Sequence, residues 1–504
     1  MLLLAIIAGA LLYLVFNFYV TRKYLNQMAT HFDGPKPNYL LGNVLEFFNK
    51  DLPGIFETMV GFHWKHGQDI VTWNVLNLNM ISVTSAQNVE KVIMAKQTKK
   101  SFIYTFIEPW LGQGLLISSG EKWFHRRRII TPTFHFKVLE QFVTVFNKET
   151  DMMVENLQKH VGGSEFDIYD YVTLMALDSI CETSMGTSVH AQKNPTNRYV
   201  QNVKRMSILV LYHSISMLAG MPLLYNILHP NAYEQRKIIK ELHEFTISVI
   251  ESRRQQLESG KLKQMDSNTQ EELYSKPKMT FLDLLLNVTV EGKPLSNSDI
   301  REEVDTFMFE GHDTTTSGIS FTIYQLALNQ PIQDKLYDEI LSILGNTNSD
   351  VELTFQTLQD FRYLESIIKE SMRLFPPVPF IGRTSVEDLE MNGTIVKAGQ
   401  EFLVPIYVIH RNAKIYPDPE RFDPERFSDT AESKRGPYDY IPFSAGSRNC
   451  IGQRYAMMEM KVTLIKLIKN FRILPGESMK QLRVKSDLVL RPDRGIPVKL
   501  VARN

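Results

Sequence analysis

Cysteine is scarce in this chain of 504 residues, and its scarcity excludes two kinds of stabilised site. Only Cys181 and Cys450 occur, and no CxxC pair is present. A disulfide framework and a cysteine zinc site both need more cysteines at paired spacings, so neither is expected. A lone cysteine is more often an inert buried side chain than a ligand, so a chemical role for either one must rest on its neighbours.

The chain also lacks an excess of one charge and an internal repeat. Lys and Arg total 56, and Asp and Glu total 56 as well. A nucleic-acid partner would favour a basic balance, so no nucleic-acid partner is expected. The hydrophobic share of 43% and the charged share of 22% are ordinary for a globular protein.

The first twenty residues carry no charge and are nearly all apolar. As a helix they would be about 30 Å long, enough to cross a bilayer. Residues 1–21 are therefore interpreted as a membrane anchor. Arg22 and Lys23 follow directly, which places the rest of the chain on the cytoplasmic side. A cleaved signal peptide is the alternative, but no basic residue precedes the apolar run and no cleavage pattern follows it.

The remaining periodicity predicts a fold that is mainly α with small β-sheets. Residues 22–44 are expected to form a linker with a proline-rich hinge, and residues 45–504 a single domain. Apolar residues at three- and four-residue spacing predict helices, for example around Phe142–Leu157, Ile238–Leu257 and Leu336–Leu344. Short alternating stretches predict strands near Ile70–Trp73, Met80–Val83, Thr394–Val404 and Leu488–Val501.

Two further segments stand out by composition. The polar stretch from Gly260 to Pro277 is typical of an exposed loop. The segment Ile208–Leu228 is unusually apolar and is interrupted by Pro222. It is either a buried helix pair or a surface that dips into the membrane beside the anchor.

The strongest chemical signal surrounds the second cysteine, in the string FSAGSRNCIG from Phe443 to Gly452. If Cys450 holds a haem iron, Gly446 and Gly452 let the backbone approach a flat macrocycle, and turned N–H groups can hydrogen-bond the thiolate. Phe443 would shield the sulfur, and Arg448 would pair with a haem propionate. A helical pattern begins after Gly452 and places the thiolate near a helix N-terminus.

This string matches the FxxGxRxCxG signature, so the chain resembles the cytochrome P-450 superfamily from about Pro35 to its C-terminus. Glu370 and Arg373 resemble that family's ExxR pair, and Arg426 lies in a motif that supplies a second arginine. The resemblance implies that these three residues form a buried ion network. It also implies the family's fold, with the haem between a long central helix and the helix after the cysteine loop.

Three other residues match positions where the family contacts the haem propionates. Trp123 and Arg127 lie four residues apart in a helical stretch, similar to the family's WxxxR. Arg383 follows a proline-rich turn at the place of a further propionate partner. For Trp123 the alternative is plain packing in the core.

A long helical pattern from Ser298 to Asn329 contains Glu310, Asp313 and Thr314, whose spacing predicts one shared helix face. An acid beside a hydroxyl can relay protons to iron-bound dioxygen, and Asp313 with Thr314 resembles the family's acid–alcohol pair. These two are therefore the expected catalytic residues. The alternative for Thr314 is a hydroxyl that bonds back to its own helix.

The wider string EVDTFMFEGHDTT resembles the fourth animal family of these proteins, which includes fatty-acid ω-hydroxylases, and an invertebrate member is expected. In that branch the glutamate matching Glu310 can form an ester with the haem. The resemblance implies a monooxygenase at the endoplasmic reticulum membrane with a small, apolar, chain-like, terpenoid or xenobiotic substrate. It implies NADPH as the electron source, cytochrome P-450 reductase as partner, and cytochrome b5 as a second donor.

Two rival functions remain open at this point. One is a haem-thiolate isomerase or dehydratase that rearranges a peroxide and needs no reductase. The other is a haem sensor or carrier without enzymatic activity. The pair Asp313–Thr314 favours the monooxygenase over both.

Overall fold

The computed structural model describes most of the chain: residues 2–38, 41–73, 79–95, 99–194, 196–216, 218–219, 221–259, 280–290, 292–345, 352–428, 430 and 435–503. The predicted polar loop from Gly260 to Pro277 lies outside these residues.

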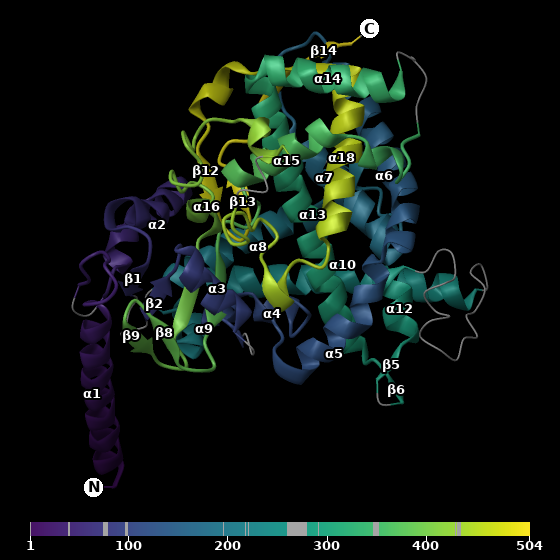
Figure 1. Cartoon of the computed structure of the whole chain (residues 1–504). Coiled ribbons are helices and arrows are strands. Elements are labelled where there is room, and N and C mark those ends of the chain that lie inside the picture. The colour runs from purple at the N-terminus through teal and green to yellow at the C-terminus, as the bar shows by residue number, and fades with distance from the viewer. Residues whose placement is uncertain are drawn as a thin grey trace.

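Helices form most of the described body, as the apolar periodicity predicts (Figure 1). The three helical examples are confirmed within longer helices: α6 (Phe136–Leu157), α10 (Asn231–Glu258) and α14 (Gln330–Leu344). The other α-helices are α1 (Leu2–Met28), α2 (Leu52–His66), α3 (Ala86–Met94), α4 (Glu108–Leu111), α5 (Gly120–Ile130), α7 (Tyr169–Ile180), α8 (Arg198–Ile215), α9 (Pro222–Leu228), α12 (Phe281–Asn287), α13 (Asn297–Leu328), α15 (Arg362–Leu374), α16 (Ile406–Ile409) and α18 (Gln453–Asn470).

The strands form small separate sheets, as expected. The largest has the order β1-β2-β10-β7-β3 and is mixed, because β10 pairs in parallel with β2 and antiparallel with β7. Its strands are β1 (Ile70–Trp73), β2 (Asn79–Ser82), β3 (Lys99–Lys100), β7 (Ile381–Thr384) and β10 (Glu401–Val404). The smaller sheets comprise β4 (Phe166–Asp167), β5 (Thr289–Val290), β6 (Lys293–Pro294), β8 (Leu389–Met391), β9 (Thr394–Val396), β11 (Phe471–Pro475), β12 (Val484–Ser486), β13 (Leu490–Pro492) and β14 (Pro497–Ala502). The fold class, mainly α with small sheets, is confirmed.

Helix α13 crosses the middle of the body and packs against α7, α15 and α18 (Figure 1). The side chain of Ser296 caps its first turn by accepting a hydrogen bond from the N–H of Asp299. Most of its residues are buried, because neighbouring helices cover it on several sides. Helix α18 begins directly after Gly452, so the cysteine loop lies at its N-terminal end.

The N-terminal helix α1 covers the predicted anchor and projects away from the body (Figure 1). Four of its described apolar side chains, Leu12, Val15, Phe16 and Tyr19, are largely exposed. Over the residues whose placement is described, no helix has the length and apolar character that a membrane crossing requires. The region expected to be a linker contributes Met28 and Phe32 to the buried cluster around the large sheet.

The apolar segment Ile208–Leu228 divides into two parts with different surroundings. In α8, Leu209 and Val210 are buried in the core, as expected for the packed alternative. In α9, Leu223 and Ile227 are 74% and 69% exposed, while Tyr225 is buried. The first half is therefore core, and the second half presents an apolar face at the surface.

Candidate active site

The loop before α18 holds Cys450 in a fixed backbone geometry. Gly446 has φ of +69°, and a Cβ there would lie 3.0 Å from the carbonyl oxygen of Ile93. Both the left-handed backbone and the close approach therefore require glycine. The N–H of Cys450 donates to the carbonyl oxygen of Phe443 over 2.9 Å. The backbone N–H of Gly452 acts on the cysteine sulfur and lowers the pKa of Cys450, which favours the thiolate.

The Cys450 thiol opens into an internal cavity of about 490 Å³. The thiol faces the cavity, so no side chain packs directly against it. The surrounding protein nevertheless shields it from bulk water, which desolvates it. This burial, followed by the nearby carboxyl of Glu310, raises the pKa of Cys450 to about 11. A metal ion would reverse this effect, because coordination deprotonates a thiol. Cys181, in contrast, is fully packed in the core.

Besides Arg127 on α5, three cations line the same cavity: Arg383 on β7, Arg448 in the cysteine loop and Lys100 on β3. Burial, followed by the charges of the two arginines, lowers the pKa of Lys100 well below its usual value. Burial, followed by the charge of Arg383, lowers the pKa of Arg448 to about 9. The cations therefore repel one another in a region that water does not screen.

The hydrogen bonding of these cations is incomplete. Arg383 donates from Nη1 to the carbonyl oxygen of Gly382, and Arg448 donates from Nη2 to that of Ser118. The Nε of Arg383 and the Nη1 of Arg448 are buried and have no hydrogen-bond partner in the described structure. A buried guanidinium with unsatisfied donors is costly, and a bound anion would satisfy both groups.

Trp123 and Arg127 both line the cavity from α5. The guanidinium of Arg448 lies 4.2 Å from the centre of the Trp123 ring, which holds this arginine over the indole face. Arg127 donates from Nη1 and Nη2 to the backbone and side-chain oxygens of Asn449, each over 2.9 Å. Arg127 therefore fixes the residue that precedes the cysteine, in addition to facing the cavity.

These residues fit a haem. Its two propionates would supply the negative charges that Arg383, Arg448 and Lys100 lack. A single thiol at the cavity wall, whose pKa the nearby N–H of Gly452 lowers, suits a ligand of haem iron. The rest of the wall is largely apolar, with Leu116, Phe309, Phe380, Leu403 and Leu488 among its residues.

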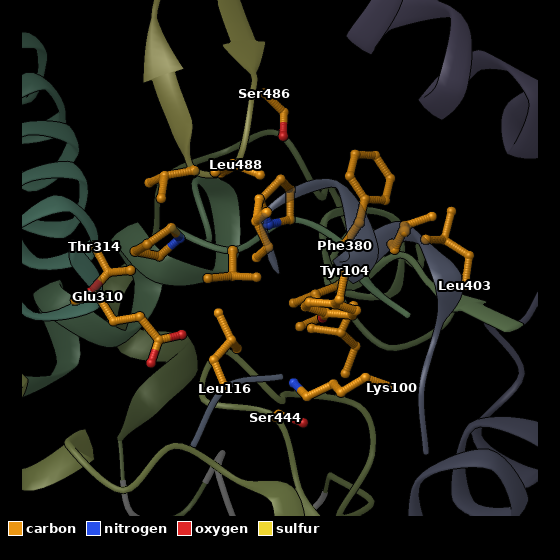
Figure 2. Close-up of a pocket in the computed structure, with 18 of the residues that line it drawn as sticks. Lys100, Tyr104, Leu116, Glu310, Thr314, Phe380, Leu403, Ser444, Ser486 and Leu488 are labelled. Atoms are coloured by element: carbon orange, nitrogen blue, oxygen red, sulfur yellow. Dashed lines mark hydrogen bonds between the residues drawn. The ribbon is translucent and has the colours of Figure 1, made fainter. Parts of the chain in front are cut away.

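Helix α13 contributes Glu310 and Thr314 to the cavity wall (Figure 2). The Glu310 carboxyl and the Lys100 side chain point into the cavity from opposite sides (Figure 2). Burial raises the pKa of Glu310 to about 7, and the charge of Lys100 partly opposes this rise. The Thr314 hydroxyl donates to the carbonyl oxygen of Glu310 over 2.6 Å. This is a bond back to its own helix, the alternative that the sequence left open for Thr314.

Asp313 lies on a different face of α13, which corrects the expectation of one shared face. Successive helical residues are rotated by about 100°, so a side chain adjacent to Thr314 points elsewhere. The buried Asp313 carboxylate forms an ion pair with Arg491 on β13, and Arg491 also bonds Asp487 over 3.2 Å. Asp313 is not among the described residues that line the cavity.

Glu370, Arg373 and Arg426 come together in one cluster. Glu370 and Arg373 are fully buried and share two hydrogen bonds, of 2.7 and 2.9 Å. The Nε of Arg426 lies 3.6 Å from Glu370, which makes this second contact looser. Arg426 also donates to the carbonyl oxygens of Pro417 and Asp418.

Two residues of this site carried no recognisable signal in the sequence. Lys100 lies in a two-residue strand that matches no motif, and its place becomes visible only when β3 pairs with β7 beside Arg383. Arg491 lies 178 positions from its partner Asp313, so spacing along the chain could not reveal the pair.

The thiol faces a largely apolar cavity, and the cations in the wall include arginines with unsatisfied hydrogen-bond donors. This combination defines a haem-thiolate site. Comparison with known proteins agrees with this class. The family model for Cytochrome P450 matches residues 33–500. The chain is 41% identical to Cytochrome P450 4d2 of Drosophila melanogaster over 473 residues, 93% of each chain. It is 43% identical to human Cytochrome P450 4V2 over 427 residues, covering 84% of this chain and 81% of the relative.

The chain therefore belongs to the cytochrome P450 family. It is a P450 monooxygenase, and the family's cofactor is a haem iron. The predicted membership of the fourth animal family is confirmed, since relatives from both Drosophila and mammals carry its names. Family membership also implies a redox partner.

Proposed function

We propose that this monooxygenase inserts one oxygen atom of O2 into an elongated apolar substrate of fatty-acid, terpenoid, hormone or xenobiotic type. Electrons come from NADPH through a flavoprotein reductase, with cytochrome b5 as a second donor. The observation that carries the proposal is the mostly apolar cavity into which Cys450, Glu310 and Thr314 all open. Such a wall binds a hydrocarbon by burial alone and excludes water from the reaction.

Different residues of the cavity have different roles in the proposed reaction. When bound, a haem would supply the oxygen-activating chemistry of the reaction. Cys450 would supply its thiolate ligand, while Arg383, Arg448 and Lys100 would hold the propionates. The Thr314 hydroxyl can accept and pass a proton at the cavity wall, because rotation frees its lone pairs and its hydrogen.

Product analysis tests this function. The haem-loaded, full-length protein is combined with reductase and NADPH under ¹⁸O2, with fatty acids and terpenoids as candidate substrates. A monooxygenase incorporates one ¹⁸O atom per product and consumes NADPH. Product formed from a lipid peroxide without NADPH would instead indicate an isomerase, and the absence of any substrate-dependent NADPH consumption would indicate a haem carrier.

We also propose that Glu310 becomes joined to the haem by an ester. The Glu310 carboxyl faces the cavity, where desolvation raises its pKa to about 7, and an ester would remove the charge that this site disfavours. The reaction joins a carboxylate oxygen to a haem methyl carbon, releases one methyl proton, and transfers two electrons to the O2 consumed during turnover. After turnover, extraction with acidic organic solvent should leave haem on the denatured wild-type chain and release it from Glu310→Ala. Haem fully extractable from the turned-over wild type would contradict the ester.

We propose, finally, that residues 1–21 hold the enzyme in the endoplasmic reticulum membrane with its catalytic body on the cytoplasmic side. The uncharged apolar run and the basic residues Arg22 and Lys23 support this orientation. The exposed apolar side chains along α1 support its contact with the membrane.

A further inference from the structure

The last turns of α1 and the residues after them contact the body, although the first turns project away from it (Figure 1). The helix runs without interruption from Leu2 to Met28 and so continues past the predicted anchor at residues 1–21. A continuous helix bends only gently, so contacts that fix its last turns also fix the direction of its first turns. We refer to residues 22–34, which make these contacts, as the joint.

Apolar side chains of the joint are buried in the cluster around the large sheet. Met28 is 0% exposed and Phe32 is 1% exposed. Tyr24 packs against the same cluster, one helical turn before Met28. The cluster also contains Val71 and Trp73 of β1. Residues four positions apart lie on one face of a helix, so the exclusion of water holds this face of α1 against the body.

Polar contacts of two further groups oppose rotation of the helix about its own axis. The guanidinium of Arg22 lies 4.5 Å from the centre of the buried Trp73 ring, a favourable position for a cation. The Tyr24 hydroxyl accepts a hydrogen bond from the backbone N–H of Lys397 over 3.2 Å, directly after β9. Arg22 and Tyr24 are two positions apart and therefore leave the helix in different directions.

The chain after α1 adds backbone contacts with β1 and with the hairpin β8–β9. The N–H of Val71 donates to the carbonyl oxygen of Asp33 over 2.8 Å. A Cβ at Gly34 would overlap the carbonyl oxygen of Val71, so the close approach of the two backbones requires glycine. The Nδ1 of His31 lies 3.2 Å from the carbonyl oxygen of Asn392, in the turn between β8 and β9. Contacts therefore continue from the helix into the sheet.

We propose that the joint holds the body at one fixed tilt to a phospholipid bilayer, because it connects α1 to the sheet through continuous contacts. The inference rests on the proposed membrane anchor and goes beyond it, since an anchor alone would leave the body free to turn. The same strand connects the joint to the haem cavity. The N–H of Asn43, a residue of the cavity wall, donates to the carbonyl oxygen of Trp73 over 2.6 Å. The cavity should therefore keep one position relative to the lipid.

Distances between two spin labels test the joint without a membrane. Tyr19→Cys and Lys65→Cys place labels at exposed positions of α1 and α2, in full-length, haem-loaded protein that also carries Cys181→Ser. The haem is kept reduced and CO-bound, so that it is diamagnetic. In detergent micelles this parent protein should give one narrow distribution of distances. Inserting the flexible sequence Gly-Ser-Gly-Ser between Val20 and Thr21 separates the anchor from the joint and should broaden the distribution severalfold.

Substitutions within the joint should act in the same direction as the insertion. Arg22→Ala combined with Tyr24→Phe removes both polar contacts and leaves the buried Met28 and Phe32 in place. This double variant should broaden the distance distribution, though less than the insertion does. Lys23→Ala is the matched control, because Lys23 is an exposed cation next to Arg22, and it should keep the narrow distribution.

The tilt itself is measured in aligned phosphatidylcholine bilayers. The angle dependence of the electron paramagnetic resonance spectrum of the ferric haem gives the haem tilt and its spread. Leu223→Asp and Ile227→Asp are included in every protein, so that the exposed apolar side chains of α9 cannot hold the body in place of the joint. The parent should show a single tilt, and the Gly-Ser-Gly-Ser insertion should remove most of the angle dependence.

A broad distance distribution in the parent would overturn the inference, and so would a haem tilt whose spread the insertion leaves unchanged. A narrow distribution in a protein that does not enter bilayers would uphold the rigid joint and refute the proposed anchor. A protein that enters bilayers but shows a broad distribution would uphold the anchor and refute the joint.

Discussion

At the scale of single residues, the buried pair of Glu370 and Arg373 connects three separate parts of the chain. Glu370 accepts a hydrogen bond from the N–H of Asp423, and Arg373 donates to the carbonyl oxygens of His410 and Arg421. Desolvation raises the pKa of Glu370, while Arg373 opposes the rise. The pair therefore keeps its charges only while both partners are present.

Replacing one partner should prevent accumulation of the haem-loaded protein. Arg373→Leu and Glu370→Gln each leave an uncompensated group in the interior, at a cost of about 3–5 kcal/mol. A typical domain has only about 5–15 kcal/mol of stability to lose. The yield of haem-loaded protein per cell measures the effect, with Arg362→Leu as the control at an exposed position of the same helix. A soluble, haem-loaded Arg373→Leu protein would show that the pair is dispensable.

Thr314 is expected to affect how much of the NADPH consumed is lost as hydrogen peroxide. Thr314→Ala should still bind haem and substrate, but it should release severalfold more hydrogen peroxide per NADPH consumed, because the hydroxyl that passes protons is gone. Thr314→Ser should restore the wild-type ratio. Thr322→Ala removes a hydroxyl that bonds back to the same helix outside the cavity, and it should change nothing. An unchanged peroxide ratio in Thr314→Ala would refute the relay.

Residues with local motifs were predictable, and residues fixed by distant contacts were not. The cysteine loop and Thr314 lie in short motifs that carry the resemblance to the family, and that resemblance implied the pair Glu370–Arg373. Lys100 and the partner of Asp313 do not, because strand pairing and a contact between α13 and β13 bring them into place. Helical geometry alone, however, separates Asp313 from the face that holds Glu310 and Thr314.

At the scale of elements, helix periodicity was the more reliable guide. Long amphipathic helices such as α6 and α10 carry many repeats of their apolar spacing, so their positions were correct. The apolar segment Ile208–Leu228 was ambiguous, since composition cannot distinguish a core helix from an exposed apolar one. Only the packing of α8 and the exposure of α9 separate its two halves.

The apolar face of α9 should act as a second membrane contact. Deleting residues 1–22 should therefore leave a protein that still floats with phospholipid vesicles. Adding Leu223→Asp and Ile227→Asp to the deletion should abolish flotation, because both exposed side chains become charged. Ile247→Asp with Leu328→Asp, at exposed apolar positions elsewhere, should not. A deletion protein that is already fully soluble at low salt would contradict this role for α9.

At the scale of the whole molecule, many separate segments of the chain together form the wall of the haem cavity. Its wall draws on segments from Asn43 to Val489, so residues distant in the sequence meet at one surface. The general architecture was predictable from the resemblance of the motifs to a known family. The shape and lining of the cavity were not, because they depend on contacts between distant segments, such as the hydrogen bond of Ser317 on α13 to the carbonyl oxygen of Leu490 on β13.

The central claim is that Cys450 is the thiolate ligand of the haem iron, and the absorption spectrum of the reduced, CO-bound protein tests it most directly. The wild type and Cys181→Ser should both show the long-wavelength Soret band of a thiolate-ligated haem, because Cys181 is packed in the core away from the cavity. Cys450→Ser should lose that band, since a hydroxyl cannot donate electron density comparably. Persistence of the band in Cys450→Ser would contradict the account.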